Sequence, residues 1–149
     1  MINDDLKLRG DVAIVLKDKD GNVKDSREIN NLVVSAGLTY ICSRMEGTSA
    51  NVMSHMALGS DTTAAAAGDT DLGSILGSRE ALDSTTASSN TITYVSSFEA
   101  GEGTGAVTEA GIFNAATSGT MLCRTVFAVV NKQADDTMSV TWTITLTAS

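Results

Sequence analysis

The sequence predicts a mainly β protein: an antiparallel β-sandwich or jelly-roll-like domain with one α-helix at about residues 31–46. Short segments rich in β-branched residues recur along the chain, with Gly, Asp and Asn turn signals between them, as in sandwiches and barrels. Residues 138–147 alternate strictly between apolar residues and Ser or Thr, which indicates a strand with one buried face. At 149 residues, we expect a single domain over 1–149.

The first elements are expected to form a hairpin. Residues 8–18 contain the run VAIVL, which is apolar on both faces and predicts a central strand. Residues 18–22 read DKDGN, and Gly21 supplies the positive φ that a hairpin turn favours. Residues 23–29 are mostly polar and predict a more exposed return strand. Residues 1–9 are expected to form an extended N-terminal arm.

The segment 31–46 predicts a helix because its apolar residues recur at helical spacing. Asn30 or Asn31 can serve as N-cap, and Gly47 follows as a C-cap glycine would. Gly37 lies inside the helix, where glycine is unfavourable, so we expect close packing against a neighbour there. The residues predicted to form the buried face are Val34, Leu38, Ile41, Cys42 and Met45.

The middle of the chain predicts a short strand at 52–59, a long loop at 60–78, and a further strand at 79–85. The four alanines at 64–67 favour helix, but Gly68 and the flanking Thr and Asp residues favour loop. A loop of this length is usually functional or an interaction element.

The last third predicts strands at 91–98, 107–113 and 121–130, followed by the alternating strand, in which Trp142 lies on the apolar side. Glu109 and Arg124 each interrupt an apolar strand, and one short turn joins the two strands. A hairpin would make them neighbours. Because an unmatched charge in a core costs several kcal/mol, we interpret Glu109 and Arg124 as a structural ion pair.

Charge and composition exclude several classes of function. The net charge is −8, and the basic residues form no dense cluster, which argues against binding to nucleic acid or to an anionic membrane surface. No apolar run reaches the length of a membrane span, and the N-terminus shows no secretory signal. Cys42 and Cys123 form no motif. We expect two buried free thiols, with a disulfide as the alternative.

Catalytic and metal-binding patterns are weak. His55 is the single histidine, and no nucleophile elbow surrounds any serine. Asp18, Asp20 and Asn22 have Gly21 in the wrong register for an EF-hand. The glycines at 101, 103 and 105 precede a predicted strand rather than a helix, so they are not a phosphate-binding loop. We expect no enzyme activity, no cofactor and no metal.

Four stretches, in this order, resemble a module of tailed-bacteriophage virion proteins, found in small capsid decoration (cement) proteins and in collar or tail-fibre attachment proteins. They are NLVVSAGLTYICSRM, MALGSDTTAAAAGDTDL, TEAGIFN with GTMLCRTVF, and the closing WTIT strand. One departure concerns charge: the resemblance leads us to look for an acid at position 75, and this chain has Ile75.

The resemblance implies a jelly-roll-like fold, self-assembly and no catalysis. It favours a capsid decoration protein on the virion exterior, made in the host cytoplasm, that binds the major capsid protein as a dimer or trimer. A collar, baseplate or fibre-adaptor protein is the alternative, and a carbohydrate-binding module is a third. The candidate contact residues lie in the arm and the long loop: Asp4, Asp5, Leu6, Thr62, Thr63, Asp69, Thr70, Asp71 and Leu72.

Overall fold

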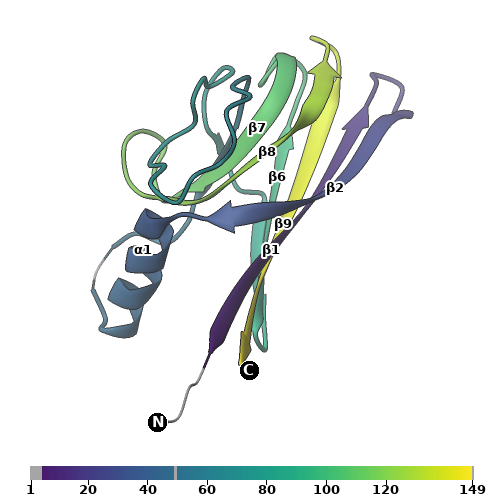
Figure 1. Cartoon of the computed structure of the whole chain (residues 1–149). Coiled ribbons are helices and arrows are strands. Elements are labelled where there is room, and N and C mark those ends of the chain that lie inside the picture. Colours follow the sequence, from purple (N-terminus) through teal and green to yellow (C-terminus); the bar gives the residue numbers. More distant parts are fainter. Residues whose placement is uncertain (1–4, 49, 149) are drawn as a thin grey trace.

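The computed structural model describes residues 5–48 and 50–148, which form one curled antiparallel sheet and one helix (Figure 1). The strand order is β4-β3-β7-β8-β2-β1-β9-β6-β5. The elements are β1 (Leu6–Lys17), β2 (Val23–Val33), α1 (Ser35–Met45), β3 (His55–Gly59), β4 (Glu80–Ala81), β5 (Ser84–Ser88), β6 (Thr91–Phe98), β7 (Gly105–Phe113), β8 (Met121–Lys132) and β9 (Thr137–Ala148). The mainly β class with one helix is confirmed.

The two halves of the sheet meet at β2, which pairs with a different neighbour at each end. Residues 23–31 pair with β1, and Leu32 and Val33 pair with Arg124 and Cys123 of β8. Away from this contact β2 and β8 are linked by Arg27, whose guanidinium donates to the carbonyl oxygens of Ala128 and Val129 at 2.8 and 3.1 Å. The sheet therefore curls at β2 as one continuous sheet, in place of the two separate sheets of a sandwich.

The main core lies between the two halves. Trp142 and Val12 from the β1–β9 half and Phe98 from β6 are at most 1% exposed, and they share one apolar cluster with Met56 and Ile112 from the other half. The alternation of residues 138–147 thus predicts the buried side of β9 correctly, Trp142 included. The opposite face of β9 carries the threonines, as expected.

The predicted helix is partly wrong, both in its start and in its buried face. Asn31–Val33 belong to β2, and Val34 is the N-cap without a side-chain hydrogen bond. The close packing predicted for Gly37 is present, because a Cβ there would overlap the carbonyl oxygen of Leu122. This contact turns Leu38 and Met45 outward, with exposures of 44% and 83%.

Four further expectations need correction. Residues 6–9 are not a free arm, because they pair with Thr145–Ala148 of β9. The predicted strand at 79–85 is two short strands, β4 and β5, and β3 begins only at His55. Cys42 and Cys123 are both free, but only Cys123 is buried.

Candidate functional site

The structure brings Glu109 and Arg124 together on the face of the β7–β8 hairpin that points away from the main core. In the register of the two strands Arg124 lies opposite Gly111, so that Glu109 is its diagonal neighbour. Arg124 Nε donates to Glu109 Oε2 at 2.9 Å, and a second guanidinium nitrogen lies 2.9 Å from the same oxygen. Glu109 is completely buried and Arg124 is 2% exposed.

The long loop 60–78 closes over this pair by donating backbone N–H groups to the Glu109 carboxylate. Oε1 accepts from Ser74 N at 2.8 Å and from Asp61 N at 3.2 Å, and Oε2 accepts from Gly73 N at 3.0 Å. Together with Arg124, the two carboxylate oxygens are fully occupied. Hydrogen bonds to an ionised acceptor are stronger than neutral ones, so Glu109 fixes both limbs of the loop at once.

Arg124 reaches into the same loop with its remaining N–H groups. It donates to Asp69 Oδ2 at 2.8 Å, to the Thr63 carbonyl at 3.1 Å, and to Asp61 Oδ2 at 3.5 Å. Burial by itself lowers the pKa of Arg124, but the bonds to Glu109 and Asp69 outweigh it and the pKa is raised. Hydrogen bonding from Ala66 N, and then from Arg124, lowers the pKa of Asp69. We call these residues — Asp61, Asp69, Glu109 and Arg124 — the loop anchor.

Glycines make room both for the loop anchor and for the loop that covers it. A Cβ on Gly59 would overlap the Glu109 carboxylate, and one on Gly111 would lie 3.1 Å from Leu72 Cδ2 and 3.3 Å from the Cys123 carbonyl oxygen. Gly111 therefore lets Leu72 pack against the sheet beside Phe113 and Met121, which are fully buried.

Arg79 is a contributor that the sequence analysis does not single out. Its guanidinium stacks 3.6 Å above the Phe113 ring and donates to the carbonyl oxygens of Ala115 and Ser118 at 3.0 and 2.6 Å. It also lies 3.5 Å from Asp71 Oδ1. Arg79 thus ties the end of the loop to the turn between β7 and β8. The only signal available in the sequence is an arginine just after a long loop.

The candidate contact residues lie in two places, on the long loop and at the start of β1, and not all of them are exposed. Thr62, Thr63, Thr70 and Asp71 are exposed on the loop, whereas Asp69 is held by Arg124. Leu72 is half-buried against the sheet. Asp5 and Leu6 are exposed at the start of β1, and Asp4 lies outside the described residues.

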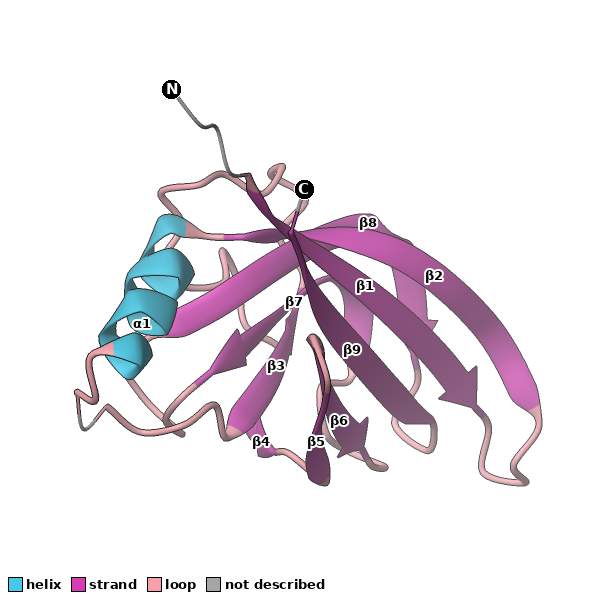
Figure 2. Ribbon diagram, turned by 90° about the horizontal axis from the view of Figure 1, so that it is seen from below, coloured by secondary structure: helices cyan, strands magenta, loops and turns pink. Residues whose placement is uncertain are grey.

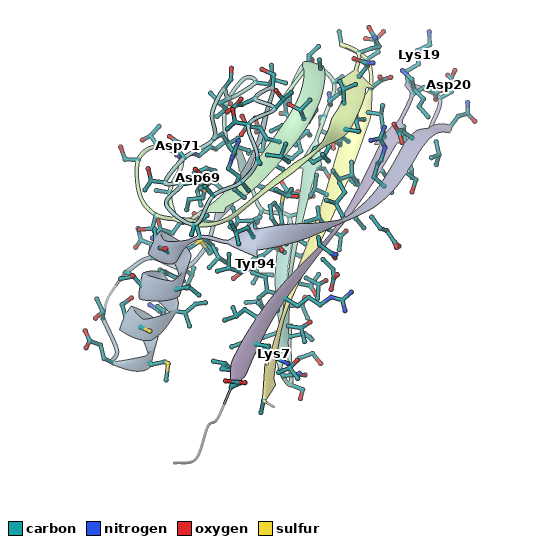
Figure 3. All side chains as sticks on the ribbon, in the orientation of Figure 1. Lys7, Lys19, Asp20, Asp69, Asp71 and Tyr94 are labelled. Atoms are coloured by element: carbon teal, nitrogen blue, oxygen red, sulfur yellow. The ribbon has the colours of Figure 1, made fainter. Side chains whose placement is uncertain are left out.

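The start of β1 and the loop lie at different ends of the molecule. In Figure 3, Lys7 near the start of β1 is far from Asp69 and Asp71 on the loop. The two predicted contact elements therefore do not form one continuous surface.

The loop anchor is built to hold structure rather than to move protons. A general base needs a free lone pair near substrate, and every oxygen of Glu109 accepts a bond from the protein itself. Among the described residues there is no group of three or more His, Cys, Asp or Glu side chains arranged to hold a metal ion. His55 contacts its neighbour Ser54, with Oγ 2.8 Å from Nδ1.

Comparisons with known proteins gave no match to any family model, to any curated protein or to any solved structure. Over the described residues, no helix is long and apolar enough to cross a membrane.

Proposed function

We propose that this chain is a structural protein of a bacteriophage particle, a decoration protein that binds the outer surface of the major capsid lattice and stabilises it. The observation that carries the proposal is the loop anchor, which holds a long surface loop in one conformation. A contact loop that is ordered before binding loses less conformational entropy on association. A collar, baseplate or fibre-adaptor location uses the same surface and is the alternative.

The residues behind the sequence resemblance support this proposal, because many of them converge on the loop anchor. Gly59, Asp69 and Leu72 come from one stretch, and Glu109 and Arg124 from another. In the structure they lie within one network of contacts. The residues that carry the resemblance therefore belong to one structural unit of this chain. A sugar-binding platform is disfavoured, because Trp142 is buried in the core.

The test is binding of the purified protein to capsids assembled without it, followed by sedimentation of the particles. We expect Thr62→Arg with Thr70→Arg to weaken binding at least tenfold, with the thermal midpoint unchanged, because both side chains are exposed on the loop. The matched control is Thr86→Arg, an exposed threonine on β5, which should bind like the wild type.

Counting copies per virion by quantitative mass spectrometry separates the two locations. Hundreds of copies support a decoration protein, and a handful supports a collar or adaptor. Absence of the protein from purified virions, or glycan binding by the isolated protein, would overturn the proposal.

A further inference from the structure

The helix α1 has an apolar stripe that no part of the described chain covers. Leu38 and Met45 are 44% and 83% exposed, and Cys42 between them is exposed as well. Figure 2 shows α1 at the periphery, with the sheet on one side of it only. Single exposed apolar residues are common, but a continuous stripe marks an interaction surface.

The spacing of the stripe is that of a helix–helix contact. Its members are four and then three residues apart, as in the seam of a two-helix pair. Cys42 lies near the middle, with Leu38 on one side along the axis and Met45 on the other. A second α1 running antiparallel would place its Met45 on Leu38, its Leu38 on Met45, and the two Cys42 residues side by side. Such self-complementarity is what a two-fold contact requires.

Charge at the two ends of the helix selects the antiparallel arrangement and a second copy as the occupant. The N-terminus of α1 has no side-chain cap and no acidic residue in its first turn, although Ser35 N donates to the carbonyl oxygen of Ala67 at 2.7 Å. Glu46 stands at the C-cap, where its Oε1 accepts from Thr48 Oγ1 at 2.8 Å. In an antiparallel pair, Glu46 of each copy lies beside the first turn of the other helix, where its partial positive charge favours a carboxylate. A parallel pair would place the two Glu46 residues together.

Like Glu46, the other charged side chain near this stripe has a partner within its own chain. Arg44 donates to the carbonyl oxygen of Ala50 at 2.7 Å within its own chain. The contact surface is therefore apolar along its length, with complementary charge at its ends. We propose that α1 is the contact of a homodimer in which two copies pack this helix antiparallel through Leu38, Cys42 and Met45. This dimer forms without a capsid, and it goes beyond the proposed particle binding.

Sedimentation velocity of the purified protein in reducing buffer tests the dimer. We expect a concentration-dependent dimer whose dissociation constant rises about a hundredfold in Met45→Glu, because each dimer loses two buried side chains of this size. The matched control is Val23→Glu, which changes an apolar residue of 60% exposure far from α1. It should dimerise like the wild type.

Thiol cross-linking tests the register. Oxidation with diamide should give a disulfide-linked dimer in the wild type and none in Cys42→Ser, because Cys123 is buried. In the Cys42→Ser background, Leu38→Cys and Met45→Cys should cross-link with each other when mixed. Neither should cross-link with itself, since an antiparallel pair separates two copies of either position by about 10 Å along the axis.

Three results would overturn the proposal: a monomer at all concentrations, a dimer that Met45→Glu leaves intact, or a Met45→Cys variant that cross-links with itself. Because the measurement uses no capsid, its failure leaves the proposed particle binding standing. Failure of particle binding likewise leaves the dimer standing.

Discussion

Arg124 and Lys132 are two buried cations on the same strand, β8, and their partners differ. They are 2% and 1% exposed. Arg124 is surrounded by the carboxylates of Glu109, Asp69 and Asp61. Lys132 donates instead to a backbone carbonyl, that of Glu99, at 2.9 Å. Burial lowers the pKa of Lys132, and the nearby charges of Asp136, Glu102 and Glu99 oppose this only in part.

The difference shows what each cation contributes to the fold. Arg124 organises a loop, because its fork of N–H groups reaches several acceptors at fixed angles, which a lysine cannot do. Lys132 satisfies one carbonyl near the far end of the strand, and its own charge is a cost there. The charge of Arg124 therefore stabilises the fold, whereas the charge of Lys132 costs stability.

The largest effect is expected at the loop anchor. Arg124→Met or Glu109→Gln should each lower the free energy of unfolding by about 3–5 kcal/mol, because removing one partner of a buried pair leaves the other unmatched. The double variant should lose much less than the sum of the singles, as contacting residues do. Urea denaturation at pH 7 measures all three. Additive losses would show that the pair is not coupled.

A smaller effect is expected for Lys132→Met, which keeps the volume and removes the charge. We expect the free energy of unfolding to change by no more than about 1 kcal/mol, because the lost hydrogen bond is offset by the lost burial of a charge. Urea denaturation beside Arg124→Met gives the comparison directly. A loss as large as that of Arg124→Met would mean that both cations hold the fold in the same way.

The smallest effect concerns acid stability. The pKa of Asp69 is lowered in the folded state, so its contribution is present above the unfolded pKa of about 3.9 and is lost as the pH falls through the folded value. Asp69→Asn should therefore lose less stability than the wild type between pH 5 and pH 2.5, measured by urea midpoints. Asp71→Asn, on the same loop but without contact to Arg124, is the control. An acid loss in Asp69→Asn equal to that of the wild type would contradict the assignment.

Local patterns in the sequence predict the parts of this fold that depend on periodicity or on a turn. The alternation around Trp142 identifies β9 and its buried face. The DKDGN turn is present as expected, with Gly21 at a φ of 84° and Gly21 N donating to the Asp18 carbonyl. The pairing of Glu109 with Arg124 follows from two charges on strands joined by one turn. Each of these inferences needs only neighbours along the chain or across one hairpin.

The parts that sequence patterns miss depend on contacts between distant segments. Asn31–Val33 look like the start of a helix, but pairing makes them strand: Asn31 pairs with β1, and Leu32 and Val33 pair with β8. The buried face of α1 is decided by Gly37, whose missing side chain allows close approach to Leu122. The glycine itself predicts this close packing, but the periodicity of the apolar residues does not show that this contact decides which face of α1 is buried. Sequence patterns also do not predict that the loop encloses Glu109, because the loop donates to this carboxylate through backbone N–H groups, which every residue type except proline carries.

The pairing of β1 with β9 has a consequence for how the chain acquires its structure. Leu6 lies opposite Ala148 in the sheet, so this ladder joins segments more than a hundred residues apart. The entropy of closing so large a loop is lost before the β1–β9 contacts can compensate for it, and folds dominated by such pairings fold in milliseconds to seconds rather than microseconds. Until β9 pairs with it, β1 presents an open edge that contains the apolar run VAIVL. Partly folded chains with such edges aggregate readily. By pairing with β1 on one side and β6 on the other, β9 therefore also removes this open edge.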